Sequence, residues 1–532
     1  MPYSQLSAVR RSRTRDRSDP MPALRTVTTA ALLAAPLLVL PLLVLPALGA
    51  AGTSAPAVGP IGAAAGNAPL PASAAVPARP NIVLLTTDDQ TLTDLGAMPV
   101  TRRLLKAQGV TLTGISPHPL CCPARAEILT GQFAQNNGVI SNTGEHGGYG
   151  RLDTSSTLAT WLHDAGYRTA FMGKFLNGYS TADVTDPTPG WDEWHPTVAG
   201  VYNYLDFTID HNGTMKAYEN SYQTDVFADL ADDVLDRFAV QDEPFFLWQS
   251  FVAPHGSCQP SQELRCWGPP RPARRHRGLF SDAMPPAFSD PAFNEADVHD
   301  KPAWVQQRPR LSSTRQQEIV RTHRERLRAL QAVDEAVGRV VSTLRQHGKL
   351  ANTLIVFTSD NGYLLGEHRL LGKNVPYEPA LRVPFLMRGP GIPAGVTRSQ
   401  VGALVDIAPT IAAAALVTPG LDVDGRNLLP VARGGAPSWT NLLIQAGKEP
   451  GPDVDHLWFF RGVRTSRYTF VAYPATGERE LYDRRKDPHQ LTSLTTNRRY
   501  ADVKAELNRR LQILRTCAGA QCRQQFAALP PV

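Results

Sequence analysis

From residue 80 onward, short apolar runs alternate with longer segments of helical periodicity. Each apolar run ends in polar residues, which is the pattern of a buried parallel strand. Four such runs lie at 82–85, 167–174, 244–255 and 353–361. Segments 156–166 and 324–348 instead carry apolar residues three and four positions apart, as one face of a helix does. Strands alternating with amphipathic helices predict an α/β fold, a doubly wound and mostly parallel sheet flanked by helices.

The pattern changes after about residue 430. Segment 467–488 alternates apolar and polar residues around a turn at "ATGE", which predicts an antiparallel hairpin. A charged helix over 501–514 should pack on this hairpin. We therefore expect a large α/β domain over 80–430 and a smaller C-terminal α+β subdomain over 431–532.

The first 79 residues have a different character. Several arginines precede an apolar run that is broken by three prolines and followed by small residues, as in an export signal over 1–50. An uncleaved membrane anchor is the alternative, because the run approaches spanning length. Residues 51–79 are rich in Ala, Pro and Gly and predict a linker. The expected location is secreted or extracytoplasmic, without stable membrane association after cleavage; Sec and twin-arginine export both stay open.

Composition and charge argue against one class of binding partner. The 532 residues include 42% hydrophobic and 19% charged residues, which suits a globular protein with a large core. The net charge is +6, but the basic residues are scattered rather than arranged in a stripe with interleaved aromatics. This distribution argues against a nucleic-acid partner.

Six cysteines can be divided into three close pairs. An exported chain can hold disulfides, and Cys258–Cys266 and Cys517–Cys522 are the natural local bridges. The neighbours Cys121 and Cys122 would need a strained small ring to bridge. A zinc site there lacks a second Cys or His pair at ligand spacing.

Polar side chains gather where the four predicted strands end. These residues are Asp88, Asp89, Lys174, His255, Asp360 and Asn361. Ligands of doubly wound folds bind beyond the carboxyl ends of strands. The oxygen-bearing side chains suit a hard cation such as calcium or magnesium. Together with Arg125 and Lys373, the cationic groups suit an anionic tetrahedral substrate, a sulfate or phosphate ester.

The sequence "CCPARAEILTG" adds a candidate nucleophile. Pro123 fits the first turn of a helix, which would place Cys121 at the positive end of the helix dipole, close to Arg125. A cysteine in that environment is expected to be a reactive thiolate.

This stretch resembles the signature of the type I, formylglycine-dependent sulfatases of the alkaline phosphatase superfamily. "PNIVLLTTDDQ", "GKFLNGY", "APH", "SDNGYLLGEH" and "GKNVPYEPALRVPFLMRGPGI" match the family in order. The resemblance covers about residues 80–514 and is closest to N-acetylglucosamine-6-sulfatase-like and arylsulfatase members. It identifies 80–430 as the catalytic domain.

The resemblance implies a role for each matching residue. A formylglycine-generating enzyme would convert Cys121 to Cα-formylglycine (3-oxoalanine), whose hydrate supplies a geminal diol. One calcium, rather than magnesium, would be held by Asp88, Asp89, Asp360, Asn361 and residue 121. Arg125 would stabilise the diol and Asp360 would help to deprotonate it. Lys174 and Lys373 would bind the sulfate, and His255 would protonate the leaving group with assistance from Lys373.

Some positions depart from the commonest family pattern. Many family members carry a histidine two residues after the lysine that matches Lys174, whereas this chain has Leu176 there, followed by Asn177. Asn177 is therefore a candidate substrate contact. His368 is either a substitute for the missing histidine, as a second substrate contact, or a histidine of a surface loop. The expected function is a secreted sulfatase acting on sugar or aryl sulfates, including 6-sulfated N-acetylglucosamine. A phosphoesterase or phosphonate hydrolase of the same superfamily is the alternative, and a non-catalytic glycan-binding relative is a third reading.

Overall fold

The structure is a computed structural model that describes residues 79–179, 188–258, 268–448 and 457–532. The expected export signal, the linker up to residue 78 and Cys266, the expected partner of Cys258, lie outside the described residues.

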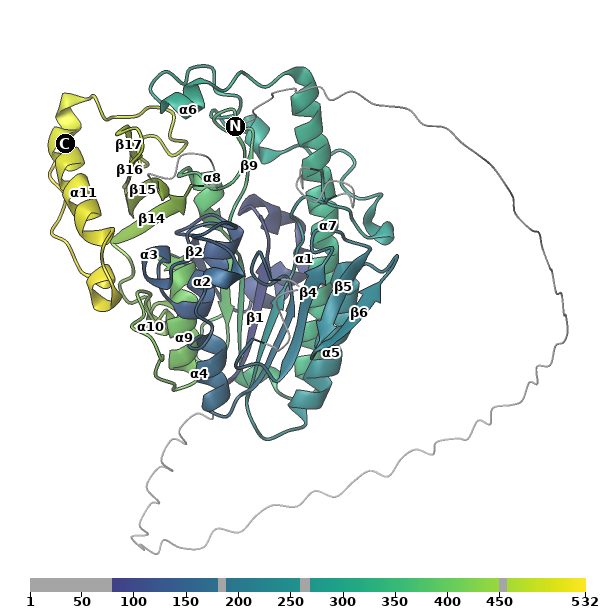
Figure 1. The fold of residues 1–532 in the computed structure, drawn as a ribbon. Coiled ribbons are helices and arrows are strands. Elements are labelled where there is room, and N and C mark those ends of the chain that lie inside the picture. The colour runs from purple at the N-terminus through teal and green to yellow at the C-terminus, as the bar shows by residue number, and fades with distance from the viewer. Residues whose placement is uncertain (1–78, 180–187, 259–267, 449–456) are drawn as a thin grey trace, which may run out of the picture. The chain divides into compact units, whose positions relative to one another are not determined.

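A mixed sheet forms the centre of the large domain (Figure 1). In spatial order its strands are β11 (Arg382–Val383), β2 (Val110–Ile115), β12 (Phe385–Arg388), β8 (Thr353–Ser359), β1 (Asn81–Thr87), β7 (Phe245–Ser250), β3 (Arg168–Gly173), β4 (Glu193–Ala199), β5 (Phe207–His211) and β6 (Thr214–Tyr218). A further strand, β13 (Val396–Ala403), pairs with β2.

The four strands expected from the apolar runs are β1, β3, β7 and β8, and they are adjacent and parallel. β4 extends this parallel centre, whereas β12, β5 and β6 join it in antiparallel pairs on either side. The predicted α/β fold is confirmed, with antiparallel strands toward both edges of the sheet. Since the parallel strands are neighbours, their carboxyl ends lie along one edge of the sheet.

Helices cover both faces of the sheet, which explains the unbroken apolar runs. Ile82 and Leu84 of β1 belong to the core cluster formed with α2 (Cys121–Thr130), α4 (Leu158–Asp164) and α9 (Ile407–Ala414). Val83 and Leu85 point to the other face, toward α5 (Gln223–Ala239) and α7 (Ser313–Gln346). Alternate side chains of a strand are therefore buried in two different cores. Shorter helices are α1 (Pro99–Thr101), α3 (Ala134–Asn137), α6 (Ala303–Gln306), α8 (Glu378–Leu381) and α10 (Leu429–Gly434).

Helix α7 begins eleven residues before the predicted start at residue 324. The Ser312 side chain caps it by accepting a hydrogen bond from the backbone N–H of Arg315 at 3.2 Å. Most side chains in the first turns are partly or fully exposed. An exposed helical segment has no apolar stripe, so periodicity detects only the part that packs on the sheet.

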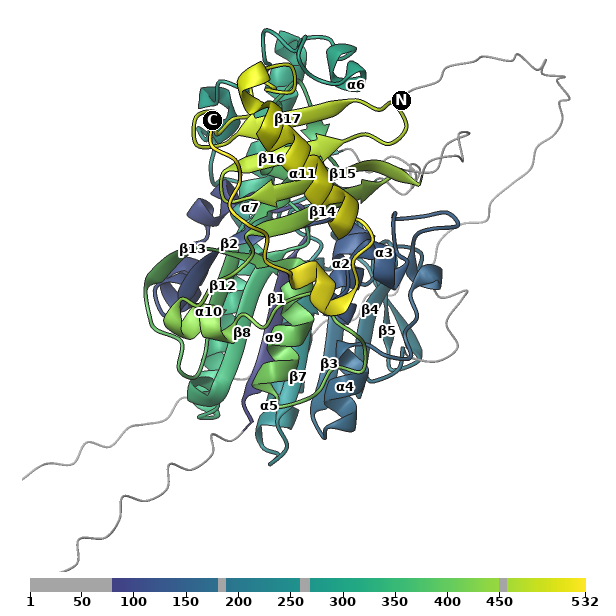
Figure 2. The same cartoon turned by 90° about the vertical axis from the view of Figure 1, so that its left-hand side faces the viewer.

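A smaller antiparallel sheet and helix α11 (Ala501–Leu514) form the C-terminal region (Figure 2). The strands are β14 (Asn441–Gly447), β15 (Trp458–Thr465), β16 (Tyr468–Ala472) and β17 (Arg479–Asp483), in that order. β16 and β17 form the expected hairpin, with Tyr468 opposite Asp483. This sheet lies beyond the carboxyl ends of the central strands, and the N–H of Gln445 donates to the carbonyl of Pro117 at 2.9 Å.

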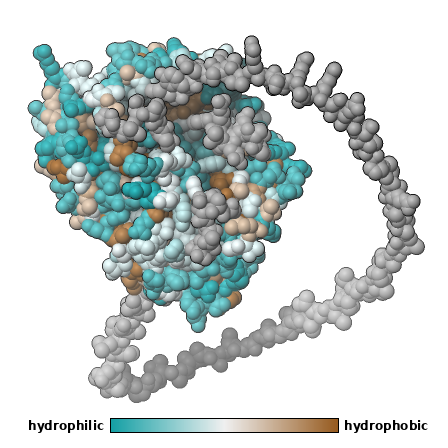
Figure 3. All heavy atoms as spheres, viewed as in Figure 1, coloured by the Kyte–Doolittle hydropathy of each residue, from teal (hydrophilic) through white to brown (hydrophobic). Residues whose placement is uncertain are grey.

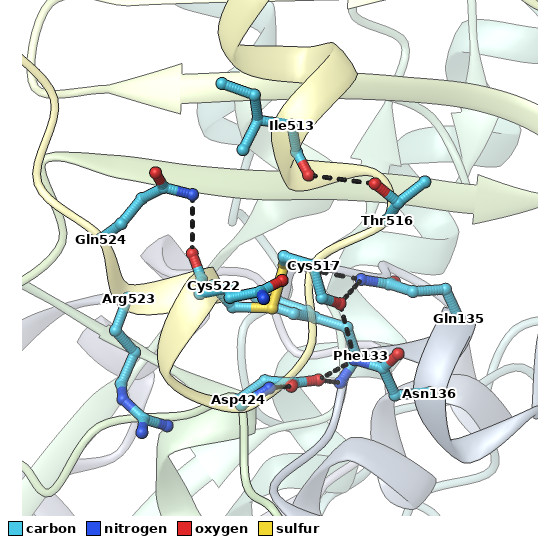
Figure 4. Close-up of a disulfide and its surroundings, with 12 residues drawn as sticks. Phe133, Gln135, Asn136, Asp424, Ile513, Thr516, Cys517, Cys522, Arg523 and Gln524 are labelled. Carbon is cyan, nitrogen blue, oxygen red and sulfur yellow. Dashed lines mark hydrogen bonds between the residues drawn. A yellow bond between two sulfur atoms is a disulfide. The ribbon is translucent and has the colours of Figure 1, made fainter.

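A disulfide between Cys517 and Cys522 closes the turn after α11 (Figure 4). Asn136 donates from Nδ2 to the carbonyl of Cys517 at 2.9 Å and to Asp424 at 2.8 Å. The N–H of Gly519 also donates to Asp424, at 2.7 Å. The disulfide turn is thereby attached to the large domain.

Hydrophilic residues cover most of the coloured surface in Figure 3, and hydrophobic residues form small separate patches there. None of the helices in the described ranges combines the length and apolar character needed to cross a bilayer.

Candidate active site

The residues that follow β1 and β8 meet because these strands are in register. Thr87 lies opposite Ser359, and the N–H of Asp360 donates to the carbonyl of Thr87 at 3.1 Å. The N–H of Asp89 in turn donates to Oδ1 of Asp360 at 3.2 Å. Asp89 adopts a left-handed backbone conformation with φ 66°, which turns the chain away from the strand direction. Asp88, Asp89, Asp360 and Asn361 are thus brought to one point.

These four side chains form an oxygen-rich cluster that is almost completely buried. Nδ2 of Asn361 donates to Oδ1 of Asp89 at 2.6 Å, and the buried Oδ1 of Asn361 has no hydrogen-bond partner among the described residues. An unpaired amide oxygen beside carboxylates is a donor set that suits a hard cation. Asp88 and Asp89 also place ligand atoms within 4.8 Å of those of Cys121 and His255. The residues present therefore fit a bound hard cation.

Helix α2 presents Cys121 to this cluster. Cys121 is its first residue, and Pro123 lies in the first turn, where the absent N–H of proline costs no hydrogen bond. Gly131, with φ 68°, ends the helix in a left-handed conformation. Cys122 is completely buried in the core on this face of the sheet and carries a free thiol.

Cys121 Sγ lies 3.4 Å from Oδ1 of Asp88 and 2.7 Å from Nζ of Lys373. Burial, with a further contribution from Asp88, raises the pKa of this thiol to about 12 despite the nearby lysines. The expectation of a reactive thiolate is therefore wrong for the unmodified residue. The loss of hydration on burial outweighs the cations and the helix terminus.

Arg125 is one turn further along α2 and is only 1% exposed. Its guanidinium forms two contacts with Oδ2 of Asp360, at 3.0 Å from Nε and 2.9 Å from Nη2, and lies 3.6 Å from Asp88. Nη1 donates to the carbonyl of Lys174 at 2.6 Å and to the Ser250 hydroxyl at 2.5 Å. Arg125 therefore joins the ends of β3, β7 and β8.

Two lysines from different segments complete the charged site. Lys174, directly after β3, pairs with Asp88, and Lys373 pairs with Asp89 and lies 3.7 Å from Asp88. Lys373 follows β10 (Leu371–Gly372), which forms a short hairpin with β9 (Leu364–Leu365). Burial alone would lower the pKa values of both lysines, but the aspartates outweigh it and raise them.

The aspartates respond in opposite ways to this environment. Burial favours the neutral form of Asp88, yet Lys174, His255, Lys373 and Arg125 together hold its pKa far below the usual value. Burial and the charge of Asp88 raise the pKa of Asp360. One carboxylate is therefore ionised firmly, while the other is better suited to accept a proton.

His255 follows β7 and directs its imidazole toward the aspartates. Nε2 lies 3.7 Å from Oδ2 of Asp89, and Nδ1 is 2.8 Å from the carbonyl of Gly256. A carbonyl can only accept, so Nδ1 carries the proton and Nε2 faces the site. Burial lowers the pKa of His255 to about 4, with partial compensation from Asp88 and Asp89.

Two of the expected substrate contacts each bond a protein neighbour through one of their two polar side-chain atoms. Nδ2 of Asn177 donates to the hydroxyl of Tyr202 at 3.0 Å. His368 is completely buried; its Nδ1 is 2.7 Å from Glu295, and its ring lies 4.2 Å from that of Tyr377. His368 is therefore not a surface loop histidine.

Sequence reasoning missed two residues of this site. Ser250, the last residue of β7, donates to the carbonyl of Lys174 at 2.7 Å and accepts from Arg125. Its position at a strand end is a signal that could have found it. Tyr202, between β4 and β5, lies against both Lys174 and His255, and no local pattern marks it.

Comparisons with protein families place this site in a known group. The model of the sulfatase family matches residues 80–417, and the model of the N-sulphoglucosamine sulphohydrolase C-terminal domain matches residues 366–517. The first match contains all the residues of the site described above.

Individual relatives agree with this assignment. An arylsulfatase of Volvox carteri is 34% identical over 86% of this chain and 78% of its own length. The N-acetylglucosamine-6-sulfatase of Homo sapiens is 30% identical over 84% of this chain and 86% of its own. A solved structure described as a complex with its substrate D-glucosamine-2-N,6-O-disulfate superposes with a TM-score of 0.67 at 25% identity, covering 84% of this chain and 98% of that one.

The family model covers more than half of the chain, and the fold has the mixed sheet with flanking helices that the solved sulfatases share. The buried site combines oxygen donors, a cysteine at a helix start and cationic groups. The chain therefore belongs to the sulfatase family, the hydrolases of sulfuric esters.

Proposed function

We propose that the protein is a secreted sulfatase that hydrolyses sugar or aryl sulfate esters with calcium and a formylglycine derived from Cys121. One observation carries the proposal. Cys121 lies beside the carboxylates of Asp88 and Asp89 and within hydrogen-bond distance of Lys373. A sulfate ester bound there would meet a cation site, a residue suited to modification and two lysines.

The bound groups supply chemistry that the unmodified chain lacks. Hydrated formylglycine at position 121 would provide a hydroxyl for attack on sulfur, and calcium held by Asp88, Asp89, Asp360 and Asn361 would polarise the sulfate. Conversion of Cys121 requires a formylglycine-generating enzyme as a maturation partner. The neutral thiol at this position is a poor nucleophile, which is consistent with a need for modification.

Protein residues would perform the remaining work. Lys174 and Lys373 carry stable positive charges beside position 121, so they can neutralise sulfate oxygens. Asp360, oriented by Arg125, can accept a proton from a hydroxyl at position 121. Burial of the site strengthens each of these interactions.

His255 is our candidate for the proton donor to the leaving oxygen. Its Nε2 faces the site, while Nδ1 is held by the carbonyl of Gly256. A bound sulfate ester would add negative charge nearby and favour the protonated imidazole. Lys373 lies close enough to assist. Because Asn177 and His368 contact Tyr202 and Glu295, we assign sulfate binding to Lys174, Lys373 and His255.

Relatives support a sugar 6-sulfate as the first substrate class to test. N-acetylglucosamine-6-sulfatases of Homo sapiens and Capra hircus align over 84% of this chain, and the solved substrate complex contains a 6-O-sulfated glucosamine. The arylsulfatase of Volvox carteri supports aryl sulfates as a second class.

A phosphonate or phosphate ester hydrolase is the alternative function. The phosphonate monoester hydrolase of Agrobacterium radiobacter has the same fold, with a TM-score of 0.62 at 22% identity. Within the described ranges, a single cluster of His, Cys and carboxylate side chains has metal-ligand spacing. One cation site favours the sulfatase reading over a two-metal phosphoesterase.

Secretion is part of the proposal. The arginine-rich apolar start of the chain supports it, as does similarity to an extracellular sulfatase homologue of Drosophila melanogaster. That relative is 36% identical over 66% of this chain, which spans 31% of its length.

The decisive experiment is mass spectrometry of the peptide containing residue 121 from protein co-expressed with a formylglycine-generating enzyme. We expect the mass of an aldehyde in place of the thiol, together with hydrolysis of 4-nitrophenyl sulfate and of a 6-sulfated glucosamine. Cys121→Ala should abolish both activities, whereas Cys122→Ala is the matched control that retains them. Full activity with unmodified Cys121, or a preference for phosphate esters, would contradict the proposal.

A further inference from the structure

Tyr202 stacks on the imidazole of His255. The ring centroids are 4.4 Å apart and the planes are inclined by 27°. The carbonyl of Tyr202 accepts a hydrogen bond from the N–H of Cys258 at 3.2 Å, so the backbone that follows His255 is bonded to the segment that carries Tyr202. The stretch between β4 and β5 thereby supports the loop that carries His255.

The stacking contact restricts a motion of His255 that its hydrogen bonds still allow, which is tilting of the imidazole plane. Nδ1 of His255 bonds the carbonyl of Gly256, and the hydroxyl of Tyr204 donates to the His255 carbonyl at 2.6 Å. These bonds select the ring orientation and hold the backbone. An aromatic face in contact with the imidazole restricts tilting of the ring plane, which would carry Nε2 away from a bound ester.

Tyr202 is itself held from the end of β3. Nδ2 of Asn177 donates to its hydroxyl at 3.0 Å, and Nζ of Lys174 lies 4.8 Å from the centroid of its ring. Lys174 at the same time pairs with Asp88. Tyr202 therefore connects the segment that binds the proposed sulfate with the histidine at the end of β7.

We propose that Tyr202 is a positioning residue that keeps Nε2 of His255 aligned with the leaving oxygen, and that Asn177 acts through the Tyr202 hydroxyl rather than on the substrate. This inference rests on the proposed role of His255. In the step concerned, an oxygen supplied at position 121, whose proton passes to Asp360, would bond to sulfur as the S–O bond of the ester breaks. The electron pair of the broken bond passes to the leaving oxygen, and the proton on Nε2 moves to that oxygen. The result is an alcohol, a sulfuryl group on the oxygen at position 121 and a neutral imidazole.

The dependence of the hydrolysis rate on the leaving group distinguishes a positioning role of Tyr202 from a general structural role. The phenolate of 4-nitrophenyl sulfate leaves without protonation, whereas a sugar alkoxide needs a proton. A mispositioned proton donor therefore slows the sugar sulfate more than the aryl sulfate. General acid catalysis contributes about 10²–10⁴-fold to rate. A partial loss of alignment should therefore lower the ratio of kcat on the sugar sulfate to kcat on the aryl sulfate by about tenfold or more.

The experiment measures kcat and KM of Tyr202→Leu, Tyr202→Phe, Asn177→Ala and His255→Ala on both substrates. For Tyr202→Leu we expect kcat on the 6-sulfated glucosamine to fall at least about tenfold more than kcat on 4-nitrophenyl sulfate, with smaller changes in KM. Tyr202→Phe keeps the stacked ring but loses the hydroxyl that Asn177 bonds, so it should retain most of the activity and resemble Asn177→Ala. Asn177→Ala should shift the ratio in the same direction as Tyr202→Leu, but less.

Tyr218→Leu is the matched control. Tyr218 is also a stacked tyrosine of this edge of the sheet, 5.2 Å from the ring of Phe207, but its ring partners do not include His255. Substitution of Tyr218 should leave the ratio of the kcat values on the two substrates unchanged. Thermal unfolding of each variant identifies any that fail to fold, and Tyr202→Phe and Asn177→Ala then carry the test.

The outcomes distinguish this inference from the proposed function. If His255→Ala lowers both activities equally, the proton-donor role is wrong and the positioning role falls with it. If His255→Ala discriminates between the substrates but Tyr202→Leu does not, the proposed function stands and the inference about Tyr202 is overturned.

Discussion

Nζ of Lys373 lies 2.7 Å from Sγ of Cys121, although 252 residues separate them in the chain. Lys373 also pairs with Asp89, so one lysine contacts both the residue proposed for modification and the proposed cation site. A sulfate group adjacent to position 121 would lie beside this ammonium group.

Replacing Lys373 should therefore damage turnover. We expect Lys373→Ala to lower kcat on 4-nitrophenyl sulfate by about 10²–10³-fold, the usual cost of removing one preorganised group that stabilises developing charge. The partly exposed Lys349, which donates to the carbonyl of Gln241, offers Lys349→Ala as a control with unchanged kinetics. Near-normal kcat for Lys373→Ala would contradict the assigned role.

Removing the cation should affect stability as well as activity. A chelator should abolish hydrolysis and lower the melting temperature, and added calcium should restore both, since a ligand that binds only the folded state stabilises it. Asn361→Ala, which removes the unpaired buried oxygen, should weaken the calcium-dependent rise in melting temperature. Asn352→Ala, far along the strand from the site, should not. A melting temperature that is insensitive to millimolar calcium would argue against the site.

Glu480 connects the small sheet to the segment that follows Lys373. It is completely buried and accepts hydrogen bonds from the hydroxyls of Tyr377, Tyr473 and Tyr482, at 2.9, 2.6 and 2.5 Å. Glu480→Ala would leave three hydroxyls without this acceptor, at about 1–3 kcal/mol for each buried group that stays unpaired.

We expect the free energy of unfolding of Glu480→Ala, measured by urea denaturation, to fall by at least about 3 kcal/mol. Glu478→Ala, on the same hairpin but with exposed bonds, is the matched control and should lose much less. Equal stability of the two variants would show that the tyrosine cluster contributes little.

The buried carboxyl group of Glu127 in α2 should make the free energy of unfolding depend on pH. It is completely buried, and neither carboxylate oxygen has a hydrogen-bond partner among the described residues. Burial, with contributions from Asp424 and Asp406, raises its pKa well above the usual 4.5. The folded state therefore binds a proton that the unfolded state releases above pH 4.5. The stabilising contribution is complete below that pH and is lost as pH rises toward the folded-state pKa.

Glu127→Gln cannot ionise and should remove this dependence. The unfolding free energy of the variant relative to the unsubstituted protein should increase by about 1.4 kcal/mol per pH unit above pH 4.5, until the folded-state pKa is reached. Chemical denaturation at several pH values measures the difference. The exposed Glu219→Gln is the control, and a constant difference between pH 4 and 7 for Glu127→Gln would exclude a buried neutral carboxyl.

The local pattern of apolar and polar residues was sufficient to predict much of the fold. The apolar runs at 82–85 and 353–361 predicted β1 and β8 because a strand buried on both faces needs apolar residues at every position. Polar residues directly after those runs predicted the meeting of Asp88 and Asp360, since parallel neighbours end at one edge. Helix α11 and the β16–β17 hairpin followed from periodicity and turn residues in the same way.

The sequence by itself thus determined the strands, the covering helices and the cluster of carboxylates at the strand ends, because these depend on period and position within one segment. Only the tertiary structure decided the neutral state of the Cys121 thiol, the stack of Tyr202 on His255 and the burial of His368. Each of these depends on how much water packing removes from a side chain and on which distant segment lies against it. Neither quantity is encoded in the spacing of residues along the chain.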